Sequence, residues 1–90
     1  MNDMTIQGLV NVFQSEWARQ SRFVGIVVQL PDLEQPEVII NPKENFEAKL
    51  AYYQKTYGED LVMVHNANIK IIGYAFGNSF AEVQQELGIA

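Results

Sequence analysis

The chain has 90 residues, of which 48% are hydrophobic and 19% charged, a balance typical of one globular domain rather than a disordered segment. Its net charge of -5 disfavours non-specific binding to nucleic acid, which needs cationic side chains, and is compatible with a basic protein partner. The absence of cysteine excludes disulfides, thiol catalysis and thiolate metal sites. The sequence shows neither a signal-peptide pattern nor an apolar run approaching the ~20 residues of a membrane span, so we expect a cytoplasmic protein without a membrane anchor.

The first predicted element is an amphipathic helix that begins after Asp3 or Thr5 and frays at residues 19–21. Its apolar side chains recur at helical spacing and fall on one face. They are Ile6, Leu9, Val10, Phe13 and Trp17. A stripe of this kind usually packs into a core, and docking into the groove of a partner is the alternative.

The segment 23–41 is predicted to form a β-hairpin. Residues 23–30 are apolar on both faces, which is typical of a strand that is covered on both sides. Residues 31–36 are mostly polar and begin and end with proline, so they form the connecting loop, and residues 38–40 form the second strand. Because few helices are available to cover two apolar faces, homodimerisation is one way to cover the rest.

The central helix has strong boundary signals. Asn41 stands at the expected N-cap, Pro42 at the first helical position and Glu44 three residues after the cap. The inner face is formed by Phe46, Leu50, Tyr53 and Tyr57. Gly58 follows them and is predicted to adopt the left-handed conformation that ends the helix.

A second hairpin follows the central helix. Residues 61–65 and 69–76 are predicted strands, and residues 66–68 are the turn between them. Strict alternation along the second strand places Ile71 and Phe76 on opposite faces.

The last predicted helix begins after Ser79, with Glu82 completing a capping box, and ends at Gly88. Its inner side chains are Phe80, Val83 and Leu87. The element order is therefore α-ββ-α-ββ-α. The simplest assembly is a single α+β domain over residues 1–90, with an antiparallel sheet of about four strands and helices packed on the sheet.

No catalytic, cofactor-binding or metal-binding constellation is evident. His65 is the only histidine and stands alone near the end of a strand. Asp32, Glu34 and Glu37 share a loop but lack the glycine and spacing of a calcium site, which favours a solvated acidic loop. We therefore expect a protein that is not an enzyme, with no catalytic residue, no cofactor and no metal.

One short segment resembles an RNA-binding strand. The run Gly73–Phe76, preceded by Lys70, is similar to the RNP1 strand of RNA-recognition motifs, in which exposed rings stack on bases. Tyr74 and Phe76 would be those rings. The hairpin-then-helix order and the acidic composition oppose this interpretation, and a β-sheet core is the alternative.

Three further side chains are candidates for contact with a protein partner. Glu82 and Glu86 lie four residues apart on the last helix, where an acidic surface would suit a basic protein, including one that normally holds nucleic acid. Solubility is the simpler explanation of this pair. Tyr52 lies off the inner face of the central helix and could anchor an interface or cover the edge of the core.

The runs EVIINPKENFEAKLAYYQKTYGEDL and IKIIGYAFGNSF resemble small uncharacterised proteins of bacteriophages and prophages of Gram-positive bacteria. The resemblance implies no activity and no functional residue, and it favours an accessory protein that binds a host or phage partner. We therefore expect a non-enzymatic protein–protein interaction domain. An acidic inhibitor that imitates nucleic acid and an RNA-binding domain that uses sheet aromatics are the alternatives.

Overall fold

The computed structural model describes residues 4–88 and confirms an α+β fold with a four-stranded antiparallel sheet. The elements are α1 (Ile6–Phe13), α2 (Glu16–Arg19), β1 (Phe23–Gln29), β2 (Glu37–Pro42), the 3-10 turn η1 (Lys43–Asn45), α3 (Phe46–Thr56), β3 (Val62–Met63), β4 (Asn66–Gly77) and α4 (Phe80–Glu86). Their order is the predicted α-ββ-α-ββ-α, except that the first helix is divided into α1 and α2. No helix in this part of the chain combines the length and apolarity needed to cross a membrane.

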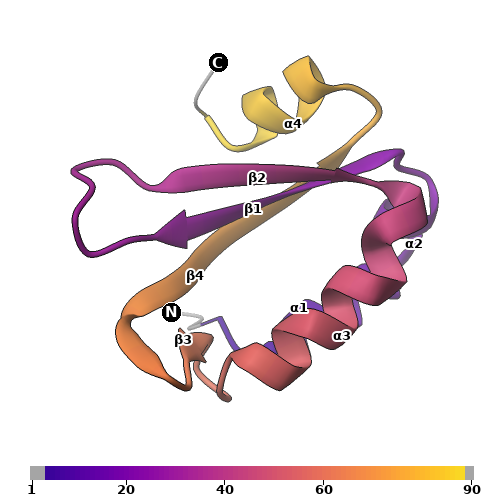
Figure 1. Cartoon of the computed structure of the whole chain (residues 1–90). Coiled ribbons are helices and arrows are strands. Elements are labelled where there is room, and N and C mark those ends of the chain that lie inside the picture. Colours follow the sequence, from indigo (N-terminus) through magenta and orange to yellow (C-terminus); the bar gives the residue numbers. More distant parts are fainter. Residues whose placement is uncertain (1–3, 89–90) are drawn as a thin grey trace.

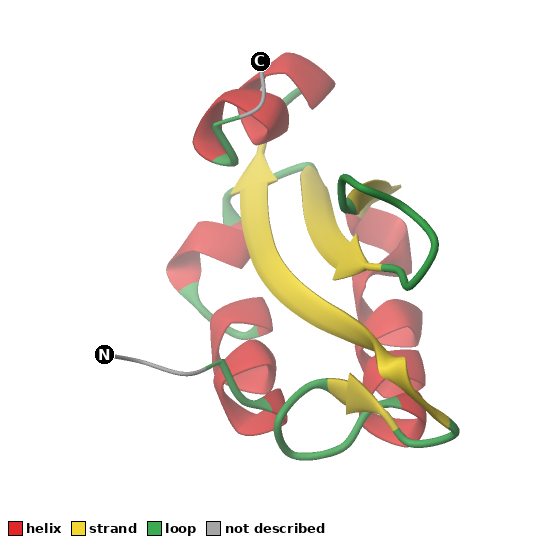
Figure 2. Ribbon diagram, turned by 90° about the vertical axis from the view of Figure 1, so that its left-hand side faces the viewer, coloured by secondary structure: helices red, strands yellow, loops and turns green. Residues whose placement is uncertain are grey.

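The strands follow one another across the sheet in the order β2-β1-β4-β3. β1 is therefore flanked on both sides, by β2 from the same hairpin and by β4 from the far end of the sequence. Helices α1, α2 and α3 lie on one side of the sheet and α4 on the other (Figure 1). Figure 2 shows the long strand β4 curving from the short hairpin with β3 toward the base of α4. β1 is thus covered on both faces, as its apolar sequence indicated.

The main core is an aromatic cluster between the sheet and helices α1 and α3. The ring of Phe13 lies 5.3 Å from that of Phe76 and 5.8 Å from that of Phe46, in edge-to-face geometry. Tyr53 contacts Phe13 from α3, at 6.4 Å between ring centres. Apolar side chains from the sheet and from the turn before β3 complete this core; those without measurable exposure are Val24, Ile26, Leu61 and Ile71.

A β-bulge in β4 changes which residues face this core. Val27 pairs with Gly73, whereas Val28 pairs with Ile71, so Ile72 is an extra residue in the ladder. The predicted strict alternation is therefore wrong across the bulge: Ile71 and Phe76 are both fully buried in the same core. Ile72 is left 42% exposed.

The N-terminal helix is interrupted rather than continuous. The Thr5 hydroxyl accepts the N–H of Gly8 at 3.0 Å and confirms Thr5 as the N-cap, while Asp3 lies outside the described residues. α1 ends at Phe13, and Ser15 caps α2 by accepting the N–H of Ala18 at 3.4 Å. Trp17, expected on the inner face, is 41% exposed because it belongs to this second short helix.

The predicted N-cap of the central helix is wrong. Asn41 belongs to β2, where it pairs with Val24, and α3 begins only at Phe46. Pairing with β1 continues as far as the N–H of Lys43, which donates to the carbonyl of Arg22 at 2.7 Å. The ladder thus overrides the local capping signal, and the Asn41 side chain is buried on the core side instead of capping a helix.

Replacing Asn41 by valine is expected to raise the free energy of unfolding by about 1 kcal/mol. The Oδ1 of Asn41 accepts a hydrogen bond of 3.4 Å from Asn45, but among residues 4–88 its buried Nδ2 has no partner. An unsatisfied buried amide costs stability that an apolar side chain does not. Urea unfolding of the variant measures the change.

The matched control is Asn68→Val, which makes the same replacement at an exposed position of β4. It reports the gain from strand propensity alone. An Asn41→Val variant that gains no more than this control, or loses stability, would show that the buried amide is well satisfied.

The end of the central helix also differs from the prediction. α3 stops at Thr56, and Tyr57 is extended, with φ -111° and ψ 146°. Among the described residues the positive φ values belong to Leu61 (65°) and Gly88 (76°), so Gly58 as a left-handed cap is wrong and Gly88 is confirmed. Leu61 accepts this unfavourable conformation because its side chain is fully buried in the core.

The second hairpin is more asymmetric than expected. β3 is only Val62–Met63, and the chain turns at residues 64–65, so the turn predicted at 66–68 is wrong. Residues 66–68 instead begin β4, where the Asn66 side chain accepts the N–H of Asn68 at 3.1 Å. The short β3 leaves β2 as the longer edge of the sheet.

Candidate functional site

The two aromatic residues that suggested RNA binding lie on the covered face of the sheet. Phe76 is fully buried, and the ring of Trp17 packs against it at 5.2 Å. Tyr74 is half-buried, with its ring 6.2 Å from that of Trp17. Base stacking needs an exposed ring face. Phe76 offers none in this fold.

The two carboxylates of the acidic pair on the last helix, Glu82 and Glu86, differ in their surroundings. The Ser79 hydroxyl accepts the N–H of Glu82 at 3.1 Å, and the Glu82 carboxylate accepts the N–H of Asn78 at 3.2 Å. The cap at Ser79 is confirmed, but the Glu82 carboxylate reaches the N–H of Asn78, one residue before the N-cap, instead of the N–H of Ser79 that a capping box uses. Glu86 is exposed, and neither a hydrogen bond nor an ion pair within residues 4–88 involves its side chain.

Tyr52 lies on the outer surface of α3 and is 48% exposed. The Lys49 ammonium lies 5.4 Å from the centre of its ring, and the neighbouring Tyr53 ring is 5.7 Å away. Burial, followed by the nearby phenols of Tyr57 and Tyr52, raises the pKa of Tyr53 to about 12. The contacts with Lys49 and Tyr53 hold Tyr52 over the edge of the core, and they do not place it in a cavity.

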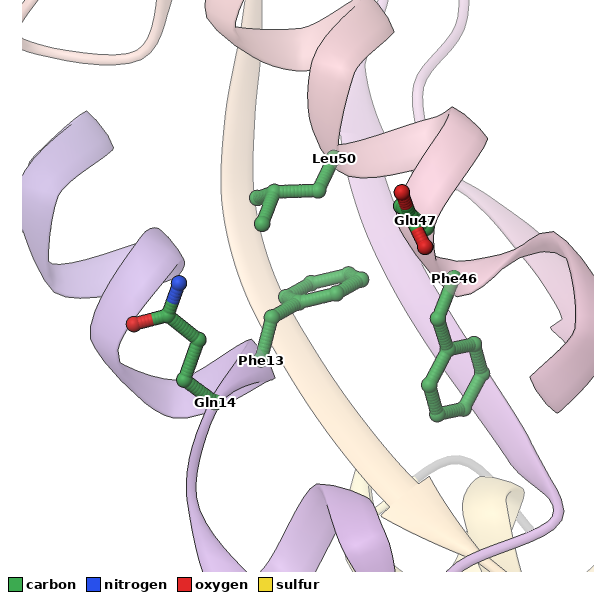
Figure 3. A pocket seen from close by; sticks show the side chains of 5 residues that line it. All are labelled: Phe13, Gln14, Phe46, Glu47 and Leu50. Atoms are coloured by element: carbon green, nitrogen blue, oxygen red, sulfur yellow. The ribbon is translucent and has the colours of Figure 1, made fainter.

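A shallow cleft separates the end of α1 from the start of α3 (Figure 3). It has a volume of about 430 Å³ and is lined by Phe13, Gln14, Phe46, Glu47 and Leu50. Its rings belong to the core, since Phe13 and Phe46 are each only 9% exposed. The cleft therefore offers a bound group little apolar surface.

The other face of the sheet carries a larger hollow. α4 is short and covers β1 and β4 where those strands have small residues: a Cβ added to Gly25 would lie 2.5 Å from Cγ1 of Val83 and 3.3 Å from Cδ1 of Leu87. The β1–β2 end of this face extends beyond the helix. There Val27, Gln35, Pro36, Val38 and Leu87 line a hollow of about 560 Å³, which we call the β1–β2 hollow.

An acidic loop borders this hollow. The loop between β1 and β2 contributes Gln35 and Pro36 to the lining and carries the exposed side chains of Asp32 and Glu34. Leu33 between them is 48% exposed. The sequence has no lysine or arginine from residue 23 to residue 42. An exposed leucine between two carboxylates, next to an apolar hollow, is a surface suited to a basic partner.

The two acidic groups predicted from the sequence do not form one patch. Carbon atoms of Glu82 would lie 3.2 Å from a Cβ on Gly77, so Glu82 lies over β4. The hollow and its loop lie over β1 and β2, on the Leu87 side of α4. Sequence reasoning missed Leu33, Val38 and Leu87 as surface residues; the available signal was a sheet apolar on both faces followed by a short last helix.

Among residues 4–88 no three histidine or carboxylate side chains are arranged so that they could hold a metal ion. Comparisons with protein-family models, with curated proteins and with solved structures found no match to this chain.

Proposed function

We propose that this domain is a non-enzymatic protein–protein interaction module that binds a basic protein through the β1–β2 hollow and its acidic loop. The observation that carries the proposal is the juxtaposition of an apolar hollow of about 560 Å³ with Asp32, Leu33 and Glu34, which are all exposed. On the resemblance of residues 37–61 and 69–80 alone, we place the domain among phage- or prophage-related accessory proteins that act in the cytoplasm.

The hollow supports apolar docking because two of its walls, Leu87 and Val38, are packed around Gly25. In the contacts around Gly25, Leu87 of α4 and Val38 of β2 approach the same point from two sides, at 3.3 and 3.6 Å from a Cβ placed there. Preformed walls lower the ordering cost of binding. A partner side chain entering the hollow would be held by apolar contact, since the lining contains one polar side chain, that of Gln35.

The charge of the loop sets the chemistry of the partner. Asp32 and Glu34 are exposed. The four strands carry one lysine and no arginine: this residue, Lys70, pairs with Gln29 at the base of the loop, so the two carboxylates outnumber the positive charge there. A basic segment would meet carboxylates at the mouth of the hollow, which increases the rate of association at low salt. The occupant we infer is therefore a protein segment with an apolar side chain next to lysine or arginine.

The acidic nucleic-acid mimic is a less suitable alternative. It relied on Glu82 and Glu86 as a pair, whereas the Glu82 carboxylate is engaged with the N–H of Asn78. Replacing Glu82 would remove a helix cap as well as a charge.

The test compares affinity capture from a host lysate by the wild type and by two variants. Leu33→Ser removes the exposed apolar side chain of the loop, and Val64→Ser is the matched control, because Val64 is 62% exposed in the other hairpin turn. We expect a basic protein that the wild type and Val64→Ser retain, that Leu33→Ser loses, and whose capture weakens as salt is raised. Equal capture by the two variants, or capture of an acidic protein, would overturn the proposal.

A further inference from the structure

The strand β2 has one unpaired edge. β2 is the outermost strand on its side of the sheet, and no strand of the described chain lies beyond it (Figure 1). In an antiparallel pair, residues alternately direct their N–H and C=O groups toward the neighbouring strand and away from it. The bond from the N–H of Lys43 to the carbonyl of Arg22 fixes this alternation. The backbone of Ile39 therefore pairs with β1, whereas Val38 and Ile40 direct theirs to the open edge.

We propose that two copies of this chain pair antiparallel along their β2 edges, about a two-fold axis at Ile39. In this register the N–H of Val38 donates to the carbonyl of the partner's Ile40, and the carbonyl of Val38 accepts the N–H of the same residue. The two-fold axis repeats these two bonds between Ile40 and the partner's Val38. The two four-stranded sheets become one continuous sheet. This pairing uses the backbone edge of β2, whereas the proposed docking site uses side chains on the α4 face; the two share Pro36, Val38 and the acidic loop. The pairing places two β1–β2 hollows in one assembly.

The flanking residues suit this register. Pro36 would lie opposite the partner's Pro42, and because proline has no N–H, neither position leaves a donor unpaired. Glu37 would lie opposite the partner's Asn41, so no like charges meet directly across the axis. Ile39, which is 38% exposed at the edge, would pack against the partner's Ile39. The prolines also confine pairing to a short segment, which opposes open-ended strand addition.

The charges near the two ends of β2 are complementary in the same arrangement. The acidic loop precedes β2, and Lys43 follows it, next to Arg22 at the start of β1. Antiparallel pairing carries Asp32 and Glu34 of one copy toward the partner's Lys43, an exposed residue whose ammonium also donates to the carbonyl of Arg19 in its own chain. This complementarity favours a second copy over an arbitrary strand.

The contact is small. Pairing through residues 37–41 buries less than the ~1,200 Å² typical of stable interfaces. We therefore expect a reversible dimer that becomes populated as concentration rises, and the test must detect a transient contact.

A cysteine at the two-fold axis provides that test, because the natural chain has no cysteine. Residues directly opposite at a non-hydrogen-bonded position lie about 4.5 Å apart between Cα atoms, within the range that a disulfide spans. Ile39→Cys is therefore expected to form a disulfide-linked dimer under mild oxidation at least ~10-fold faster than Ile72→Cys. The control residue is similarly exposed, at 42%, but lies in the bulge of β4.

Sedimentation of the natural chain gives the second measurement. We expect its mass to rise with concentration toward twice 10.2 kDa. Ile39→Lys, which would bring two ammonium groups together at the axis, is expected to abolish the rise, and Ile72→Lys to preserve it. Equal rates of oxidation for the two cysteine variants would overturn the pairing, as would a mass that stays at that of one chain. Neither result would affect the capture test with Leu33→Ser, since that residue is outside β2.

Discussion

Replacement of Phe76 by alanine is expected to lower the free energy of unfolding by about 3–5 kcal/mol. Phe76 has no exposed surface, and its ring packs edge to face with those of Phe13 at 5.3 Å, Trp17 at 5.2 Å and Phe46 at 5.6 Å. It therefore joins β4 to α1, α2 and the start of α3 at one point. Truncation would leave a cavity between elements that cannot easily move together. Urea or thermal unfolding measures the loss.

The control is Phe80→Ala, the same truncation at a ring that is 55% exposed. Phe80 packs edge to face on Phe23 at 5.2 Å, on the opposite side of the sheet. We expect it to cost less than half as much as Phe76→Ala, because most of its ring already contacts solvent. A small effect of Phe76→Ala, comparable with the control, would contradict the aromatic core and would restore Phe76 as a surface residue available for stacking.

The second large effect is expected from Gly25→Ala, which should destabilise the protein by about 1–3 kcal/mol. The new Cβ would lie 2.5 Å from Cγ1 of Val83, a distance that side-chain atoms do not tolerate. Val83 is β-branched and fully buried, so α4 itself must shift away from β1. Hydrogen exchange of the α4 amides is expected to accelerate along with the loss of global stability.

Gly73→Ala is the matched control for this prediction. It adds the same methyl group to the neighbouring strand, where the closest atom is Cγ2 of Val27 at 3.4 Å, an ordinary contact. We expect Gly73→Ala to be neutral, or slightly stabilising because alanine has less freedom in the unfolded chain. Equal free energies of unfolding for the two variants would contradict the close packing of α4 on Gly25.

The elements that sequence patterns predicted well are those whose signals are local and agree with their tertiary contacts. The cap at Ser79, the left-handed Gly88 and the strand 23–29 are of this kind. Asn41 shows where local signals fail: its capping pattern is real, but pairing with β1 continues through it, and a paired strand outweighs an N-cap. Ile72 fails for a related reason, because a bulge depends on the neighbouring strand rather than on the sequence around it.

The candidate site could be predicted only in part. The acidic loop was visible in the sequence as Asp32 and Glu34, whereas Glu37, expected in the same loop, begins β2. Nothing local indicated that α4 would stop short of Val38. Glu82 satisfied two patterns at once, a helix cap and an acidic pair, and the structure shows its carboxylate in the cap. Contacts between distant segments decide whether a side chain is free on the surface or engaged in holding the fold together. The periodicity of the sequence does not encode these contacts.

The central pairing of β1 with β4 has a consequence for how the chain folds. The two strands at the middle of the sheet come from distant parts of the sequence, with the register running from Phe23 opposite Gly77 to Gln29 opposite Lys70. Contacts between distant segments form slowly because a long loop must close first. During synthesis, β1 therefore pairs only with β2, and its other edge has no partner strand until β4 has left the ribosome. We expect any binding by a chaperone to be strongest in that interval, when the apolar strand β1 has only one neighbour.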